Sequence, residues 1–409
     1  MNVLAISTEW GLYRPPVGGR SRFFNLALQL AKEFRVTVLQ PLNVKDARDT
    51  ALLKTVYFRT NIAGRTFSSF TDFNPSFARK FVKIMAEDKI DIIQVTQPSG
   101  VAAAKCISRV IGQNVPIVYD AQNVNSDAVS SLRYLVKSSS TSFVDKIILR
   151  FYMLWLPLLE RVAIKFANHV IAVSEEDRAR FIQKYVIDPR KITVVPSGVD
   201  IQPLHLRKKP GKFPDIRQKD EFLVIFHGSF HYAPNMEAVD MIRNYLAPRF
   251  ATINKDVVFV IAGTGVPKFD ADNVRAVGFV QDIRSLIRQA DIAIVPMRSG
   301  GGTRLKVFEY MEAGLPIVTT RKGIEGIKAE NMKHAIITQD VDEEFIQAIL
   351  YLITDQSERR RIGYNARKLA QDDYDWCIIG QNLSQLYTRI AVQGALEVSS
   401  QRHNLTTGK

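Results

Sequence analysis

Short apolar runs rich in β-branched residues alternate along the chain with longer amphipathic segments. In the first half, strand-like runs such as VLAIS, RVTVLQ, DIIQVT, PIVYD, HVIAVS and KITVVP are separated by helix-like segments such as SRFFNLALQLAKEF and EEDRARFIQKY. Apolar runs of this kind predict strands, and amphipathic segments with helical periodicity predict helices. Alternation of the two indicates a parallel sheet covered by helices, so the first half is predicted to be one doubly wound α/β domain.

The pattern stops after residue 196 and then restarts. The stretch PLHLRKKPGKFPDIRQKDE is polar, contains three prolines and shows no apolar period, so a linker is predicted over 197–220. Alternation resumes with FLVIFHG, DVVFVIAG, VRAVGFV, DIAIVP and PIVTT, and three helical segments follow. We therefore expect domains over 1–196 and 221–392, and a disordered polar tail over 393–409.

Composition and charge narrow the class of protein. With 46% hydrophobic residues, the 409-residue chain can bury the cores of two ordinary domains. Its formal net charge of +14 favours anionic partners such as nucleotides, phospholipid surfaces or nucleic acid. Cys106 and Cys377 lie far apart, so neither a disulfide framework nor a zinc site is predicted, and no secretory signal is visible. A reducing, cytoplasmic compartment is therefore expected.

Ligands of doubly wound sheets bind beyond the carboxyl ends of the strands, so the loops after the predicted strands are the candidate sites. The first of them, STEWGLYRPPVGGRSR, is much longer than the G-x-G-x-x-G turn of dinucleotide-binding folds, which argues against an NAD site. Gly18 and Gly19 precede a helix, where two backbone N–H groups could meet a phosphate. An ordinary turn explains this glycine pair equally well.

Two further glycine turns fall in the second half. Gly228 and Ser229 end a strand in IFHGSFHYAPN, and in SGGGTRLKVFEY three glycines, 300–302, stand between a strand and a helix. The start of that helix offers a possible capping hydroxyl and two cations beside its positive N-terminal end. These side chains belong to Thr303, Arg304 and Lys306. Together the two turns predict a site for a diphosphate.

Glu309 lies three residues after Lys306 and six after Thr303, so its carboxylate is expected about two turns below the anion site. At that position its carboxylate could hold the diol of a ribose. The alternative is an i,i+3 surface ion pair with Lys306, which the local sequence supports equally well.

Several motifs, taken in their order along the chain, resemble those of the family-four retaining glycosyltransferases, which have the GT-B fold. The motifs are VIAVSEEDRARF, KITVVPSGVD, FHGSFHYAPN, VFVIAGTGVP, VRAVGFVQDIRSLIRQADIAIVP, GGGTRLKVFEYMEAGLPIVTT and YDWCIIGQNLSQLY, and the likeness is strongest over Asn168–Thr320. This resemblance implies two Rossmann-like domains that face each other across a cleft. It also implies a nucleotide-sugar donor held mainly by the second domain and an acceptor that approaches from the first.

The resemblance also assigns roles to residues that match the family's motifs. It implies that Gly18 and Gly19 contact the donor diphosphate. It also implies that a second set of residues, at the start of the later helix, contacts the same diphosphate. That second set is Gly302, Thr303, Arg304 and Lys306. It further implies that Glu309 holds the ribose and that the turn Gly278–Val280 faces the base. Neither a metal ion nor another cofactor is implied.

On the acceptor side, Gln122 and Asn123 lie in the loop DAQNVN, which looks like the family's acceptor loop. Gln122 stands where the family commonly has a histidine, and Gly301 stands where many members have the first of two glutamates eight positions apart. A branch of the family with GGGTRLK at this place looks similar, which indicates a substituted site. In the family chemistry the departing diphosphate can take the acceptor proton on the same face, so the enzyme contributes orientation and charge. Arg304 and Lys306 are therefore the expected catalytic residues.

Three other features of the sequence each have a functional and a structural explanation. The triplet DAD at 270–272 matches a metal-binding pattern of another transferase fold, but a solvated turn is favoured and no metal site is predicted. His227 lies within a strand, whereas His231 follows the strand end and is expected to contact the donor, although packing against Tyr232 explains it equally well. The run ERRRIGYNARK is interpreted as a solvated helix face, so nucleic acid is not expected as a partner.

The segment 146–166 carries aromatic and basic residues in an amphipathic pattern, but charges and Pro157 interrupt it too often for a membrane-spanning helix. It could lie peripherally on the inner face of a membrane, which would suit a lipid-linked acceptor. Packing of its apolar face on the first domain is the favoured alternative. Both interpretations hold if only part of the helix is exposed.

The leading hypothesis is a glycosyltransferase, of hexosyltransferase type, that moves a sugar from a nucleotide-diphosphate donor to a glycan or lipid-linked acceptor. Its place would be the assembly of a cell-surface polysaccharide or glycolipid. A sugar-nucleotide epimerase of the same fold would need acid and base side chains in the cleft, which the missing carboxylate at Gly301 disfavours. A non-catalytic nucleotide-sugar-binding protein is a further alternative, and an NAD-dependent oxidoreductase is the weakest.

Overall fold

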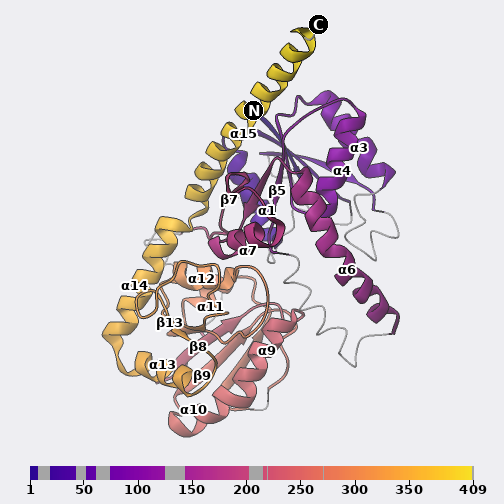
Figure 1. Ribbon diagram of the computed structural model, residues 1–409. Coiled ribbons are helices and arrows are strands. Elements are labelled where there is room, and N and C mark those ends of the chain that lie inside the picture. Colours follow the sequence, from indigo (N-terminus) through magenta and orange to yellow (C-terminus); the bar gives the residue numbers. More distant parts are fainter. Residues whose placement is uncertain are drawn as a thin grey trace. The chain divides into compact units, whose positions relative to one another are not determined.

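The computed structural model describes residues 1–7, 19–42, 52–60, 74–124, 143–201, 215–218, 220–269 and 271–407 (Figure 1). The chain folds into two compact units. Unit 1 consists of Met1–Pro196 together with Trp376–Lys409, and unit 2 consists of Ser197–Asp375. Each unit contains one sheet in which all described strand pairs are parallel.

The sheet of unit 1 has the strand order β3-β2-β1-β4-β5-β6-β7. Its strands are β1 (Asn2–Ile6), β2 (Arg35–Pro41), β3 (Leu53–Phe58), β4 (Ile92–Val95), β5 (Ile117–Asp120), β6 (His169–Ala172) and β7 (Ile192–Val194). The order reverses between β1 and β4. In sheets of this kind the reversal leaves a crevice at the carboxyl ends of the strands, where ligands bind.

Helices cover both faces of the sheet in unit 1. They are α1 (Gly19–Leu30), α3 (Pro75–Glu87), α4 (Pro98–Val110), α6 (Phe143–Phe166), α7 (Glu175–Tyr185), the short η2 (Pro189–Lys191) and α15 (Trp376–Thr407). Successive residues of β1 point to opposite faces, so Val3 packs with α1 and α15 while Leu4 packs with α3, α4, α6 and α7. Burial on both faces explains why the strands are continuous apolar runs.

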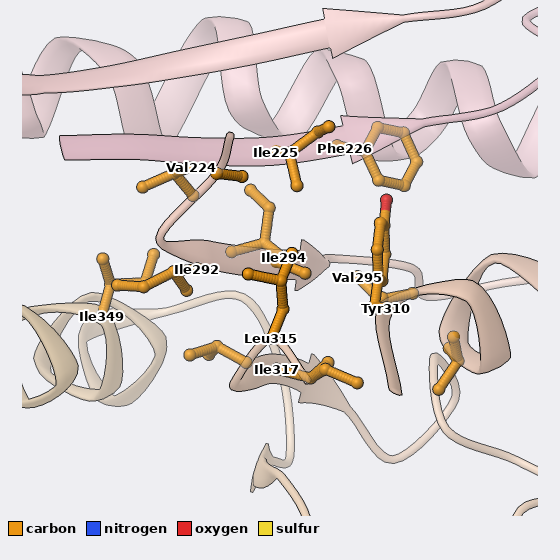
Figure 2. Close-up of a cluster of buried hydrophobic side chains, with 14 of the residues drawn as sticks. Val224, Ile225, Phe226, Ile292, Ile294, Val295, Tyr310, Leu315, Ile317 and Ile349 are labelled. Carbon is orange, nitrogen blue, oxygen red and sulfur yellow. The ribbon is translucent and has the colours of Figure 1, made fainter. Parts of the chain in front are cut away.

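The sheet of unit 2 has the order β10-β9-β8-β11-β12-β13, and it reverses between β8 and β11. Its strands are β8 (Phe222–His227), β9 (Val257–Ala262), β10 (Val274–Gly278), β11 (Ile292–Val295), β12 (Ile317–Thr320) and β13 (Ile336–Thr338). Figure 2 shows the core between the sheet and its helices, with Val224, Ile294 and Ile317 from three strands and Ile349 from a helix. Tyr310 belongs to this core, and its ring stands beside Phe226.

The helices of unit 2 are α9 (Ala233–Met241), η3 (Ile242–Leu246), α10 (Ala247–Ile253), α11 (Ile283–Ile287), α12 (Leu305–Ala313), α13 (Glu343–Thr354) and α14 (Gln356–Asp373). Aspartates cap three of them by accepting a hydrogen bond from a backbone N–H in the first turn: Asp282 caps α11, Asp342 caps α13 and Asp355 caps α14. Helix α12 ends at Gly314, whose left-handed φ of 71° suits a helix C-terminus. Gly314 thus marks the end of α12, the helix that carries most of the candidate site.

Two doubly wound α/β units confirm the predicted fold class, but the chain is divided differently from the expectation. Helix α15 belongs to unit 1, although residues 376–392 were predicted in the second domain. Its residues Leu383, Leu386 and Tyr387 are buried with α1, whose apolar face needs a cover. The helix also continues to Thr407, where a disordered tail was predicted from 393. Close packing accompanies part of this extension, because a Cβ on Gly394 would lie 2.5 Å from Pro116.

Both ends of the predicted linker pack on unit 2. The backbone N–H of Val199 donates to the carbonyl of Tyr374 at 2.9 Å, and Arg217 forms a 2.8 Å ion pair with Asp291. Residues 202–214 and 219 lie outside the described part of the chain. Within the described residues, no helix is long and apolar enough to cross a membrane.

Candidate functional site

Three strand ends meet closely at the carboxyl edge of the sheet in unit 2. The backbone N–H of Gly228 donates to Ala262 at 3.0 Å, and that of Gly263 donates to Gly278 at 2.7 Å. A Cβ on Gly263, whose φ is 139°, would lie only 1.8 Å from the carbonyl oxygen of Gly228. Only glycine permits this approach. The edge therefore brings together Gly228 and Gly278, two predicted donor-binding residues that lie far apart in the sequence.

A lysine with little access to water lies against this edge. The Nζ atom of Lys306 donates to Oδ1 of Asn235 at 2.8 Å and stands 3.9 Å from the ring centroid of Phe226. A Cβ on Gly228 would be 3.0 Å from the same Nζ atom. Burial, together with the charge of Arg304, holds the pKa of Lys306 well below its ordinary value, and the charge of Glu309 opposes the shift only in part. An anion beside Gly228 would restore a favourable environment to this ammonium group.

Asn235 and Ser229 complete the turn after β8. The side-chain amide of Asn235 donates to the carbonyl oxygen of Ser229 at 2.8 Å, so the same amide group holds the turn and the lysine. The hydroxyl of Ser229 accepts a 3.3 Å hydrogen bond from Thr264. Sequence reasoning did not single out Asn235, although it stands in the quoted motif FHGSFHYAPN.

Arg304 organises the glycine loop before α12. Its guanidinium donates to the carbonyl oxygens of the loop itself, and it is 6% exposed. The acceptors are Ser299 at 3.3 Å, Gly300 at 2.9 Å, Gly301 at 3.0 Å and Gly302. The left-handed φ values of Gly300 (105°) and Gly302 (70°) turn the carbonyls toward it. The structure thus gives Arg304 a role within the loop, and its contact with a leaving diphosphate stays a prediction.

Thr303 does not cap α12, contrary to the prediction. Arg304 occupies the N-cap position, and no side chain accepts a hydrogen bond there. The Thr303 hydroxyl oxygen is instead buried, and none of the residues that the structure describes forms a hydrogen bond with it. A buried hydroxyl without a partner is unfavourable by about 1–3 kcal/mol, so a ligand that reaches this oxygen gains a hydrogen bond at low cost.

Gly301 borders open space. A Cβ added to it would meet no described atom within 4 Å, and its φ lies outside the left-handed region that the neighbouring glycines occupy. The position where resembling enzymes carry a glutamate could therefore accept a side chain.

Glu309 pairs with His227 and not with Lys306. Its Oε2 atom lies 2.7 Å from Nε2 of His227, at the end of β8. Burial acts to raise the pKa of Glu309, but the hydrogen bond and charge of His227, with the charges of Arg284 and Lys306, hold it below its ordinary value. The i,i+3 ion pair with Lys306 is thus not formed. Sequence reasoning preferred His231 over His227, because a strand residue gives no sign of its neighbour in a distant helix.

The remaining residues of unit 2 that were predicted to contact the donor differ in their exposure. Gly278 ends β10 with a φ of 75°, and Val280 is buried in the hydrophobic core, so its side chain does not face a ligand. Phe279, between them, is 58% exposed. His231 is exposed, and a Cβ on Gly265 would lie 3.1 Å from its ring.

In unit 1, Gly18 lies outside the described residues, and Gly19 is the first residue of α1. Gln122 and Asn123 are half-buried and follow β5. An ion pair holds the two regions together: Nη2 of Arg22 in α1 lies 2.7 Å from Oδ1 of Asp120, the last residue of β5. The two side chains are 2% and 0% exposed. Sequence reasoning missed this pair, because Arg22 and Asp120 lie 98 positions apart and the local sequence around either residue gives no sign of the other.

Helix α6 presents two different faces. Leu156, Leu159 and Ala163 are buried, so part of the helix packs on unit 1 as the favoured alternative predicted. The opposite side is apolar and exposed, and Phe151 stacks on Trp155 with ring centroids 6.2 Å apart. The exposed apolar residues are Phe151 (55%), Leu154 (74%), Trp155 (37%), Leu158 (54%) and Val162 (37%).

The described part of the chain contains no group of three or more His, Cys, Asp or Glu side chains that could hold a metal ion. Of the DAD triplet, Asp270 lies outside the described residues and Asp272 is exposed in a turn.

Comparison with known proteins agrees with the fold. A family model described as Glycosyltransferase Family 4 matches residues 17–203, and one described as Glycosyl transferases group 1 matches residues 221–355. A structure of Anabaena HepE in complex with UDP-glucose superimposes with a TM-score of 0.64, at 16% identity, over 95% of this chain and 100% of that one.

Two curated relatives are similar over part of the chain. The first is the UDP-Gal:alpha-D-GlcNAc-diphosphoundecaprenol alpha-1,3-galactosyltransferase of Escherichia coli, 25% identical over 300 residues, which are 67% of this chain and 69% of that protein. The second is the phosphatidylinositol N-acetylglucosaminyltransferase gpi3 subunit of Schizosaccharomyces pombe, 20% identical over 245 residues. That match covers 56% of this chain and only about half, 51%, of the yeast protein.

The two doubly wound units and these matches define a glycosyltransferase of the GT-B fold. The model described as Glycosyltransferase Family 4 matches less than half of the chain, so membership of that family is part of the proposal below.

Proposed function

We propose that the protein transfers a sugar from a nucleotide-diphosphate donor, with retention of anomeric configuration, to a glycan or lipid-linked acceptor. Its place would be the biosynthesis of a cell-surface polysaccharide or glycolipid. The observation that carries this proposal is the charged edge of unit 2, where Lys306 lies against Gly228 and Glu309 stands one turn further along α12.

The diphosphate would bind at the start of α12. Lys306 supplies a desolvated ammonium group, and its Nζ atom lies 3.0 Å from the position that a Cβ would take on Gly228. The N-terminal end of the helix adds partial positive charge, and the Thr303 hydroxyl, which has no partner among the described residues, can donate to a phosphate oxygen. Gly302, Gly18 and Gly19 would add backbone N–H groups, as the family resemblance implies.

The nucleoside would extend from the diphosphate toward Glu309 and the turn at Gly278. Glu309 is ionised and could accept hydrogen bonds from a ribose diol. Since Val280 is buried, contact with the base would fall to the backbone of the turn and to the exposed ring of Phe279. The HepE complex holds UDP-glucose, and the name of the E. coli relative gives UDP-Gal as donor, so we favour a uridine diphosphate sugar.

In the proposed reaction the acceptor oxygen bonds to the anomeric carbon as the bond from that carbon to the diphosphate breaks. The departing diphosphate takes the acceptor proton on the same face, so no protein nucleophile is needed. Lys306 and the helix end stabilise the negative charge that develops on the leaving group. Arg304 keeps the loop in shape through its carbonyl contacts and adds positive charge nearby. We propose that this transfer needs no metal ion, and a rate lowered by EDTA and restored by a divalent metal would contradict that part.

The acceptor would approach Gln122 and Asn123, which the ion pair of Arg22 and Asp120 holds relative to α1. The E. coli relative is named for a diphosphoundecaprenol acceptor and the yeast relative for phosphatidylinositol, which supports a lipid-linked acceptor here. The choice of donor and acceptor among these classes is part of the proposal.

A lipid-linked acceptor suggests a cytoplasmic protein that is peripheral on a membrane, and α6 is the element suited to that contact. Its exposed apolar stripe is accompanied by the exposed basic side chains of Arg150, Arg161 and Lys165. Basic amphipathic helices bind anionic lipid surfaces in this way. Leu154→Glu should reduce co-sedimentation with vesicles that contain phosphatidylglycerol, and equal binding of variant and wild type would contradict the contact.

The test of the function is donor binding followed by transfer. UDP-sugars should raise the melting temperature of the wild type, and Lys306→Ala and Glu309→Ala should each reduce this response because they remove the charges that the donor meets. Lys333→Ala, an exposed lysine paired with Glu330, is the matched control and should respond like the wild type.

Measuring the products distinguishes the three candidate functions. A transferase releases free nucleoside diphosphate only when an acceptor is added, an epimerase changes the sugar without an acceptor, and a binding protein releases nothing. An unchanged response to donor in both Lys306→Ala and Glu309→Ala would overturn the site.

A further inference from the structure

A three-residue hydrogen-bonded network lies behind the candidate ribose site. The hydroxyl oxygen of Tyr310 is 3.0 Å from the backbone nitrogen of His227 and 2.9 Å from Nδ1 of its ring. On the other side of the ring, Nε2 is 2.7 Å from Oε2 of Glu309. The two rings meet edge to face, with centroids 5.1 Å apart and planes at 85°. His227 is thus fixed at both ring nitrogens.

The donors and acceptors around His227 assign its ring proton to one of the two nitrogens. The backbone N–H of His227 can only donate, so the Tyr310 oxygen accepts from it. Burial raises the pKa of Tyr310 well above its ordinary value, so the hydroxyl keeps its own proton, and Nδ1 is the acceptor within reach. With Nδ1 as acceptor, Nε2 carries the ring proton and donates it to Glu309.

The two charged side chains of α12 that face the candidate site do not pair with each other. Lys306 and Glu309 are spaced i,i+3 on one helix, where opposite charges ordinarily pair with each other. Instead Lys306 donates to the side-chain amide of Asn235, and Glu309 accepts from Nε2 of His227. Oε1 of Glu309 has no hydrogen bond from the residues that the structure describes. Each charge therefore stays available to a ligand.

We propose that His227 is a positioning residue that orients Glu309 toward the donor's ribose diol, with Tyr310 fixing the proton of His227 on the nitrogen that faces Glu309. This inference rests on the proposed function, since it takes Glu309 as the residue that holds the ribose. It adds two residues to the site, His227 in β8 and Tyr310 in α12, which act on the donor through the carboxylate of Glu309. Without His227, Glu309 would be free to turn toward Lys306.

The test measures preference for the diol and not affinity alone. UDP, GDP and ADP are titrated by calorimetry, and the tightest is compared with its 2′,3′-dideoxy form, which keeps the base and diphosphate. Loss of a hydrogen bond to a charged group should make the wild type prefer the diol by about tenfold or more. General damage to the site would weaken both ligands together, so the ratio reports the ribose contact specifically.

Glu309→Gln and His227→Leu should each reduce this preference to about twofold or less, and the double variant should show no further loss, because the two residues act as one unit. His227→Gln can place an amide N–H near Glu309 and should restore most of the preference. Tyr310→Phe removes only the hydroxyl and should give an intermediate value. His334→Leu changes another buried histidine of unit 2, bound to the backbone N–H of Glu330, and should keep the wild-type ratio.

The outcomes separate the inference from the function on which it rests. If Glu309→Gln loses the preference while His227→Leu or Tyr310→Phe keeps it in full, the inference is overturned and the proposed function stands. The inference also fails if His334→Leu lowers the ratio as much as His227→Leu does. If the wild type binds none of the nucleoside diphosphates, or does not prefer the diol, the role of Glu309 fails and the inference fails with it.

Discussion

The two units use the same kind of sheet but arrange the charges at their strand ends differently: the pair in unit 1 is buried, and the charges in unit 2 are half-buried. In unit 1, Arg22 and Asp120 neutralise each other in an ion pair almost without exposed surface. In unit 2, Lys306 and Glu309 lie on neighbouring turns of one helix, yet they do not pair with each other: Lys306 donates to Asn235, and Glu309 accepts from His227. A charge that is paired inside the protein serves the fold. A charge that is kept apart from its opposite is unfavourable for folding and available to a ligand.

The largest expected effect is on the ion pair of unit 1. Arg22→Met leaves Asp120 buried without its cation, and breaking a buried pair on one side typically lowers the free energy of unfolding by about 3–5 kcal/mol. Urea denaturation of the variant measures this loss. The double variant Arg22→Met, Asp120→Asn should recover a large part of it, because no charge is then left buried.

Replacing the cation of unit 2 by methionine should affect stability much less than replacing the cation of unit 1. Lys306→Met removes a charge that burial disfavours, so the free energy of unfolding should stay within about 1 kcal/mol of the wild type while donor binding is lost. If Lys306→Met were as destabilising as Arg22→Met, the two units would not differ in the way described.

A smaller effect concerns a neutral histidine in unit 1. His169 starts β6, and its Nε2 lies 2.9 Å from the hydroxyl of Thr193. Burial, with the charge of Arg389, lowers its pKa to about 4. The unfolded chain therefore takes up a proton more readily, so stability is complete above about pH 6.5 and falls as the pH drops toward 4. The loss from this group is at most about 3 kcal/mol.

The measurement is the free energy of unfolding at pH 7 and pH 5 for wild type and His169→Gln. The variant should lose less stability over this interval than the wild type. Parallel losses in the two proteins would show that His169 does not contribute, and that other groups cause the acid sensitivity.

The smallest expected effect is at the open position of the glycine loop. Gly301→Glu should change the free energy of unfolding by less than about 1 kcal/mol, because no described atom is near the added side chain. Gly300→Glu is the matched control, since its φ of 105° and the Tyr232 hydroxyl 2.9 Å from an added Cβ should make it clearly more destabilising, by about 1–3 kcal/mol. Equal melting temperatures for the two variants would contradict this picture of the loop.

Much of the fold could be predicted from local pattern. The run FLVIFHG became β8, and the three helical segments at the end became α13, α14 and α15, because burial on both faces of a sheet or along one face of a helix is visible in the sequence. The unit to which α15 belongs could not be predicted, because an apolar helix face does not identify the surface that covers it.

The candidate site was only partly predictable for a related reason. Glycines that precede a helix and the charges that follow them are neighbours in the sequence, so Gly302, Lys306 and Glu309 could be named. The partners of these charges could not, because His227 lies 82 positions from Glu309 and Asn235 lies 71 positions from Lys306. The inward turn of Arg304 depends on carbonyl directions that only the left-handed glycines set.

Helix α15 has a consequence for the order of synthesis. The chain leaves unit 1 at Pro196 and returns at Trp376, so all of unit 2 is made between the two parts of unit 1. Until the ribosome has passed the segment Trp376–Ile390, the apolar residues of α1 that this segment buries, among them Phe23 and Leu26, have no cover from it. Unit 2 can complete its own core first. The final step of folding on the nascent chain is then the packing of α15 onto unit 1, the unit whose synthesis began first.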